Sequence, residues 1–279
     1  MNDARQRGFS LIEMIGVLAI IAIVAAVLLP SLARKISRTN GDKEDQTLAV
    51  LGEGLDRYVR TYQVIPGQTS WATNLSVITG LAWNAVFYVD PSDAASARVY
   101  LIHPSFTPST ASGGGFADPL WTQNGSGASS VTNARLLILS SHKSTLTLPV
   151  SSGKASSSAV FDAIWDWDYS PVTGAPPSGW PAAWTGNGEY LHVQRVNLAR
   201  QFQRITFSNA HYPTVYPSAQ FGSASATNLS SAAAMDAFYL SGTYLRLYKD
   251  SGAGGTLDLS HSVETWMNFL YESNRWRIP

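Results

Sequence analysis

An uninterrupted apolar run near the N-terminus constrains this chain more than any other feature. Residues 9–29 (FSLIEMIGVLAIIAIVAAVLL) carry a single charge, at Glu13. A helix of this length rises about 30 Å, which matches the hydrocarbon core of a bilayer. The sequence therefore predicts one membrane-spanning helix, with most of the 279 residues following it on one side.

The position of the run decides how the chain should be processed. A secretory signal carries small residues at a cleavage site after its apolar stretch. Ala25-Ala26 is a poor site of that kind, because the apolar residues continue through Leu29. We expect cleavage before the run instead, between Gly8 and Phe9, which leaves the apolar helix in the mature protein.

Glu13 is the anomaly of this segment. An ionisable group at such a depth costs about 2.5 kcal/mol or more near the bilayer centre, so it indicates a function by default. A glutamate is too short to reach the interface as a lysine or arginine does. The helix itself offers no cation, so Glu13 needs a partner from outside it.

The segment Gly8-Phe9-Ser10-Leu11-Ile12-Glu13, followed by an apolar helix, resembles the prepilin cleavage and methylation motif of type IV pilins and type II secretion pseudopilins. The resemblance covers roughly residues 5–62. It implies that a prepilin peptidase cuts after Gly8 and N-methylates Phe9. It implies too that Glu13 neutralises the Phe9 amine of a neighbouring subunit. Pro30 stands where the family carries a helix-weakening proline.

The resemblance also implies partners and a location. The partners are other pilin subunits in a homo- or heteropolymer, the peptidase, an inner-membrane assembly platform, and membrane lipid before assembly. The location is the inner membrane, with one span and the head outside the cytoplasm, and then a periplasmic or extracellular filament. The alternative is a plain signal anchor that contains a glutamate by chance, but an anchor has no use for a charge at that depth.

Apolar residues continue at helical spacing beyond the span, which predicts an amphipathic second half that docks on a head. They are Leu48, Leu51, Leu55, Tyr58, Val59 and Tyr62. Gly52 and Gly54 should weaken this half by about 1 kcal/mol each. A coiled-coil seam would need sustained heptads, which are absent. We expect the helix to end between Tyr62 and Val64, before Pro66-Gly67.

The expected organisation is an α+β fold, with a long N-terminal transmembrane and amphipathic helix packed on a large β-rich globular head. Residues 1–8 are the leader, 9–64 the helix (membrane span 9–29, amphipathic half 30–64) and 65–279 the head. Alternation and β-propensity predict strands at 81–89, 98–103, 134–140, 145–150, 190–196 and 204–208. Hairpins are predicted around Ser241-Gly242 and Ser273-Asn274, with a short helix near 262–267.

Four tryptophans concentrate within twenty residues of the head: Trp165, Trp167, Trp180 and Trp184. Exposed tryptophans would suit stacking on sugars or partner proteins, whereas buried ones would serve a β-rich core. The sequence is consistent with both interpretations, a binding surface and a buried core.

Asp162, Asp166 and Asp168 lie in the same region and could offer oxygen ligands to Ca²⁺. Some pseudopilins carry a calcium site in the head. The spacing does not match an EF-hand loop, and the alternation of Trp and Asp equally suits a strand with one acidic face.

The sequence gives little support for catalysis, for thiol chemistry or for nucleic-acid binding. The chain has no Cys, which excludes disulfides and thiolate sites, and its five His stand singly. The usual hydrolase, zinc-protease, phosphate-loop and dinucleotide motifs are absent, so we do not expect an enzyme. The net charge is zero and the head has no basic run, so nothing indicates nucleic-acid binding.

Two classes of function remain. The first is a structural filament subunit that assembles through its N-terminal helix. The second is a minor or tip pilin whose Trp-rich head binds a surface, a secreted protein or a glycan.

Overall fold

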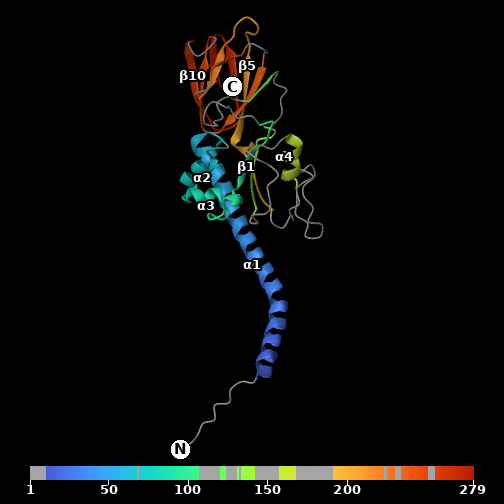
Figure 1. Ribbon diagram of the computed structural model, residues 1–279. Coiled ribbons are helices and arrows are strands. Elements are labelled where there is room, and N and C mark those ends of the chain that lie inside the picture. Colours follow the sequence, from blue (N-terminus) through green and yellow to red (C-terminus); the bar gives the residue numbers. More distant parts are fainter. Residues whose placement is uncertain are drawn as a thin grey trace, which may run out of the picture. The chain divides into compact units, whose positions relative to one another are not determined.

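The computed structural model contains a long helix and a β-rich head, so the expected α+β class is confirmed (Figure 1). It describes residues 11–67, 69–106, 120–123, 131, 133–141, 157–167, 191–222, 225–229, 234–250 and 255–279, without the side chains of Glu13 and of residues 120–123. The chain divides into two compact units, Met1–Glu44 and Asp45–Pro279.

The helices are α1 (Leu11–Tyr62), α2 (Trp71–Thr79), α3 (Trp83–Phe87) and α4 (Ser158–Trp165), with short 3-10 turns at Ala94–Ser96 and Ala199–Gln201. The strands are β1 (Val99–Ile102), β2 (Leu120–Gln123), β3 (Arg135–Ser141), β4 (Leu191–Asn197), β5 (Phe202–Asn209), β6 (Ser218–Phe221), β7 (Thr227–Asn228), β8 (Ala234–Leu240), β9 (Thr243–Tyr248), β10 (Leu257–Val263), β11 (Met267–Glu272) and β12 (Arg275–Arg277).

Helix α1 ends at Tyr62, within the predicted range, and its last 18 residues belong to the second unit. The predicted stripe is the buried side of this segment: Leu48, Leu51, Leu55 and Val59 are fully enclosed in the main core. Side chains three and four residues apart share one face of a helix, which is why the spacing could reveal the packing surface.

The two glycines of this segment are contact points. A Cβ on Gly52 would stand 2.6 Å from Nε2 of Gln194 on β4, and a Cβ on Gly54 would stand 2.5 Å from Cγ2 of Thr79 at the end of α2. At Gly52 the neighbour is the end of a flexible side chain, whereas at Gly54 it is the short, branched Thr79, so the approach of α1 to α2 is the one that leaves little room for a Cβ.

A three-stranded antiparallel sheet, in the order β1-β3-β4, packs against α1 on one face and against α4 on the other. Leu136 and Ile138 of β3 pack into the main core with α1, whereas Leu137 and Leu139 pack with α4 in a second, smaller core. Because successive strand residues point to opposite faces, a continuous apolar run such as Leu136–Leu139 fits a strand that is covered on both sides.

The C-terminal part forms two further sheets, in the orders β12-β11-β5-β8-β2 and β10-β9-β6-β7. Their facing side chains meet in the main core, where Phe221 of β6 lies 5.0 Å from the ring of Tyr239 of β8 and 6.1 Å from that of Phe207 of β5. The strands of these sheets pair antiparallel except for β5 and β11, which run parallel. This region is therefore a sandwich of two sheets.

The strand predictions at 98–103, 134–140, 190–196 and 204–208 are confirmed by β1, β3, β4 and β5, and the segment 145–150 lies outside the described residues. The Ser273-Asn274 hairpin is confirmed by the pairing of β11 with β12. Both turn residues have positive φ, 53° and 61°, as a tight two-residue hairpin requires.

Three predictions are wrong. The segment 81–89 contains helix α3 (Trp83–Phe87) instead of a strand, and Trp83 and Phe87 stack one helical turn apart on it, with ring centroids 5.1 Å apart. The segment 262–267 ends β10 and begins β11 instead of forming a helix. The strands around Ser241-Gly242 do not form a hairpin, because β8 pairs with β5 and β2 whereas β9 pairs with β10 and β6. This link carries the chain from one sheet to the other.

Candidate functional site

The first half of α1 presents an exposed apolar surface. Each large apolar side chain from Leu11 to Ile36 exposes about half of its surface or more, from 49% at Val24 to 79% at Ile12. By length and composition, α1 is the one helix in the described part of the chain that could cross a membrane. Soluble proteins rarely expose a contiguous apolar patch of this extent, so this surface requires lipid or protein around it.

The structure describes only some of the predicted site residues of this segment. Gly8 and Phe9 lie outside the described residues, and Glu13 lies in the first turns of α1 with no side chain described. Cleavage, methylation and charge pairing therefore stay predictions. Pro30 lies inside α1, which continues past it. Pro30 has no N–H for the carbonyl of Ala26, while the neighbouring Ser31 hydroxyl donates to the carbonyl of Leu28 at 2.8 Å.

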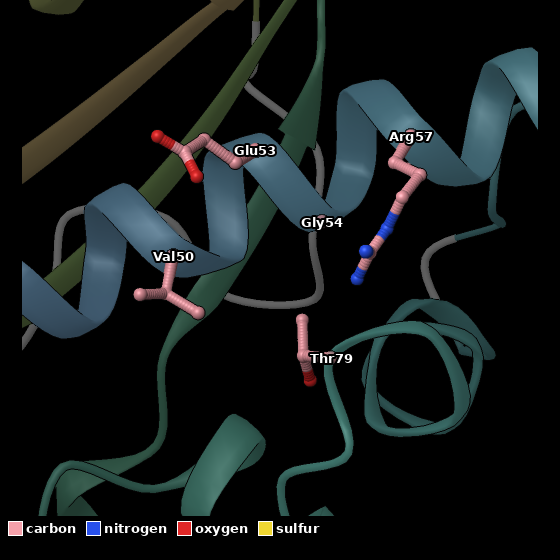
Figure 2. Close-up of a pocket in the computed structure, with 5 residues that line it drawn as sticks. All are labelled: Val50, Glu53, Gly54, Arg57 and Thr79. Carbon is pink, nitrogen blue, oxygen red and sulfur yellow. The ribbon is translucent and has the colours of Figure 1, made fainter.

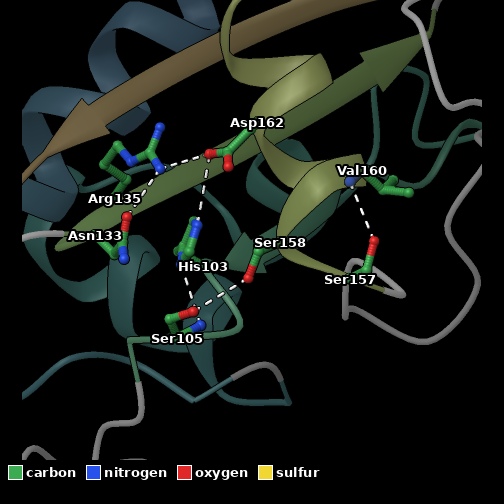
Figure 3. Close-up of polar contacts among 8 residues, drawn as sticks. All are labelled: His103, Ser105, Asn133, Arg135, Ser157, Ser158, Val160 and Asp162. Atoms are coloured by element: carbon green, nitrogen blue, oxygen red, sulfur yellow. Dashed lines mark hydrogen bonds and ion pairs between the residues drawn. The ribbon is translucent and has the colours of Figure 1, made fainter.

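In the head, Asp162 belongs to a cluster of polar side chains from α4, β3 and the segment after β1 (Figure 3). Helix α4 begins at the N-cap Ser157, whose hydroxyl accepts the N–H of Val160 at 3.2 Å. One turn further, Oδ1 of Asp162 accepts from the Arg135 guanidinium at 2.5 Å. The carboxylate thereby ties α4 to β3.

His103 follows β1 and is buried against the same carboxylate. Its Nδ1 accepts the N–H of Ser105 at 3.1 Å, and its Nε2 lies 3.5 Å from Oδ1 of Asp162. Burial and the nearby Arg135 charge lower the pKa of His103, and together they outweigh the opposing effect of Asp162. The neutral form of the ring is therefore favoured in the folded protein.

This cluster contains Ser, His and Asp side chains, but its geometry is not that of a catalytic triad. The hydroxyl of Ser105 faces that of Ser158 at 3.1 Å, and it is the backbone of Ser105 that bonds to His103. A nucleophilic serine needs its own hydroxyl against the histidine. Spacing could not have revealed the cluster, because His103, Arg135 and Asp162 come from distant parts of the sequence.

The predicted calcium ligands are only partly described. Asp162 is engaged with Arg135, Asp166 is exposed at the C-cap of α4, and Asp168 lies outside the described residues. Among the residues that the structure describes, no group of three or more His, Asp or Glu side chains could hold a metal ion. The Asp162, Asp166 and Asp168 site stays a prediction, and a calcium-dependent rise in melting temperature would support it.

The predicted tryptophan surface is described for two of its four members. Trp165 and Trp167 are partly buried and pack against the smaller core, and Trp165 stacks on Phe161 at 6.1 Å. The Arg135 guanidinium carbon lies 5.2 Å from the Trp165 ring centroid. These contacts give Trp165 a structural role. Trp180 and Trp184 lie outside the described residues, so a shared binding surface stays a prediction.

A shallow hollow of about 300 Å³ lies beside the second half of α1 (Figure 2). It is lined by Val50, Glu53, Gly54, Arg57 and Thr79. The Arg57 guanidinium donates to the carbonyl of Ile78, and the Thr79 hydroxyl donates to the carbonyl of Leu75 at 2.7 Å. The Arg57 bond therefore joins α1 to α2, whereas the Thr79 bond lies within α2, and the hollow adjoins the close approach of the two helices at Gly54.

Comparison with known proteins identifies only the N-terminal segment. Residues 3–29 match the model of the prokaryotic N-terminal methylation motif, which is a structural motif and does not define an enzyme family. No curated protein and no solved structure gives a significant match to the chain.

Proposed function

The chain carries the prokaryotic N-terminal methylation motif on a long apolar helix and so fits a type IV pilin-like protein, and from this premise we propose that it is a structural subunit of a type IV pilus-like or type II secretion pseudopilus filament. One observation carries the proposal. The motif stands at the start of a helix whose large apolar side chains, from Leu11 to Ile36, are about half exposed or more in the described part of the chain.

Processing is the first step of the proposed function. The motif implies a prepilin peptidase as partner, with a cut between Gly8 and Phe9 and methylation of the new amine. Intact-mass measurement of the mature protein tests this step. A mature chain that still begins at Met1, or one that begins after Ala26, would refute it.

The uncovered helix then has two successive environments. We place it in the inner membrane as a single span before assembly, with the head outside the cytoplasm. In the filament, helices of neighbouring subunits would replace lipid around it. Both environments cover the same apolar surface, which is the physical reason why one segment could serve as membrane anchor and as assembly core.

Glu13 would set the register of assembly. Cleavage creates a cation at Phe9, four residues from Glu13, and that cation is poorly placed at the positive end of its own helix dipole. Pairing Glu13 with Phe9 of a neighbour would neutralise both charges in an apolar surrounding. A buried pair of this kind adds little net stability, but a wrong register leaves one charge unpaired, which is strongly unfavourable.

The Glu13→Leu variant tests the pairing. Membrane insertion and cleavage should remain normal, while incorporation into sheared filaments falls sharply. Immunoblots of sheared and whole-cell fractions measure both quantities, and Leu18→Ile in the same apolar segment is the matched control, because it changes neither the charge nor the volume of the helix surface. Normal filament yield from the Glu13→Leu protein alone would rule out the charge pairing.

A second role, that of a minor or tip pilin that recognises a partner through its head, is favoured by one observation. The head exposes large aromatic side chains in its described part, among them Tyr212, Tyr216 and Tyr244. Copy number separates the two roles, because a major subunit dominates sheared filaments and a tip subunit is scarce in them.

A further inference from the structure

The loop that joins β5 to β6, residues 210–217 (AHYPTVYP), presents two tyrosine rings to solvent. We call it the aromatic loop; it is the orange segment that follows β5 in Figure 1. Tyr212 and Tyr216 expose 37% and 40% of their surface. Their centroids are 6.5 Å apart and their planes meet at 69°, so the two rings form an edge-to-face pair.

The aromatic loop is held in shape from within. Asn209, which is buried at the end of β5, accepts the N–H of His211 at 2.9 Å and donates to the carbonyl of Val215 at 2.6 Å. The carbonyl of His211 in turn accepts the hydroxyl and the N–H of Thr214, at 2.7 and 2.8 Å. One buried side chain therefore spans the whole turn between the tyrosines.

The aromatic loop is also fastened to the neighbouring β11–β12 hairpin. The N–H of Ala210 donates to the carbonyl of Tyr271 at 3.0 Å, and the N–H of Ser273 donates to Nε2 of His211 at 3.1 Å. These contacts leave the two tyrosine side chains free at the surface. A ligand that stacks on preorganised rings does not have to order a loop, which removes part of the usual entropic cost of binding.

The chemistry of the aromatic loop favours an uncharged ligand. Residues 210–217 contain no Lys, Arg, Asp or Glu. Neither tyrosine hydroxyl is bonded to another residue of the described part of the chain, so both can donate to and accept from a ligand. Flat apolar faces with neutral hydroxyl groups at their edges match the apolar faces and hydroxyl groups of sugar rings.

The size of the aromatic loop argues against a folded protein as its main ligand. A stable protein complex buries about 800 Å² on each partner. Two partly exposed tyrosines on an eight-residue loop offer far less, whereas one or two sugar rings need no more. We therefore propose that the aromatic loop binds a neutral glycan, with pyranose rings stacked on Tyr212 and Tyr216. The proposal rests on the second role above, and does not require the filament role.

The test uses the full chain in a detergent without a sugar headgroup, so that detergent does not compete. The probes are immobilised neutral gluco-, manno-, galacto- and chito-oligosaccharides, beside sialylated and sulfated glycans. We expect the wild-type chain to bind at least one neutral probe. The double variant Tyr212→Ala/Tyr216→Ala should bind it about tenfold more weakly or worse. It should still unfold cooperatively, at a somewhat lower melting temperature, because each ring is more than half covered.

Three further variants keep the test specific. Tyr212→Phe/Tyr216→Phe retains both rings and should retain most of the binding. His211→Ala removes the anchor to Ser273 and should weaken binding although both rings remain. Tyr244→Ala removes a tyrosine of β9 that is more exposed, at 50%, and should leave glycan binding unchanged. Binding of charged glycans alone, binding of no probe, or binding that survives the loss of both rings would overturn the proposal. Filament yield of the same variants, measured separately, tests the structural role.

Discussion

Gly52 and Gly54 lie two residues apart on α1, and we predict that alanine has opposite effects on stability at the two positions. Each change gains about 1 kcal/mol of helix propensity. The new methyl group at Gly52 would meet the end of the flexible Gln194 side chain, whose amide makes one long hydrogen bond, 3.3 Å to the carbonyl of Arg195. Because that side chain can swing away, we expect Gly52→Ala to stabilise the head by about 0.5 kcal/mol.

At Gly54 the new Cβ would stand 2.5 Å from Cγ2 of Thr79, which is short and β-branched. Rotation of Thr79 would break its 2.7 Å hydrogen bond to Leu75, at about 1 kcal/mol, and overpacking typically costs about 1–3 kcal/mol. After the gain of about 1 kcal/mol in propensity, we expect Gly54→Ala to destabilise the head by about 1–3 kcal/mol.

Urea unfolding of the full chain in micelles, followed by tryptophan fluorescence, measures these changes. The double variant Gly54→Ala/Thr79→Ser is the decisive comparison, because serine keeps the hydroxyl and removes the methyl group. The two changes should couple by about 1–2 kcal/mol, so that the double variant is more stable than Gly54→Ala. If Gly54→Ala stabilises as much as Gly52→Ala, or if no coupling appears, the close approach of α1 to α2 is not what requires Gly54.

Three further predictions concern the head. Gly242→Ala should destabilise by about 1–2 kcal/mol in thermal melts, because Gly242 has φ +87° and a Cβ would stand 2.6 Å from Nε2 of Gln63; an unchanged melting temperature would contradict this. The pKa of His103 lies below its ordinary 6.5 in the folded state, so the stabilisation from the neutral ring is full above pH 6.5 and is lost as the pH falls below it. His103→Gln should therefore flatten the pH dependence of the melting temperature between about pH 7 and 5. An unaltered profile would count against the buried neutral ring. Trp165→Ala should lower the unfolding free energy by about 1–2 kcal/mol, because the ring packs between Phe161 and Arg135; loss of ligand binding at unchanged stability would favour the surface role instead.

Two features of the structure could be predicted from the spacing of residues along the chain. The buried stripe of α1 could be predicted because residues three and four apart share a face whatever lies opposite. The turn at Ser273-Asn274 could be predicted because a two-residue hairpin depends mainly on its own two dihedral pairs. The Tyr-Pro-Thr-Val-Tyr-Pro stretch is visible in the sequence as well, but its spacing does not indicate which rings remain exposed.

The methylation motif, the apolar run and the extent of α1 follow from the sequence itself, because each depends on residues that are neighbours along the chain. Only the tertiary structure decides that Ser241-Gly242 passes between two sheets: the N–H of Ser241 donates to Gln201 and that of Gly242 to Val263, which come from different segments. Partner choice among strands depends on which distant side chains bury one another, and no local pattern contains that information. For the same reason, the sequence predicts only that Gly52 and Gly54 weaken α1. The tertiary structure shows that they lie against Gln194 and Thr79.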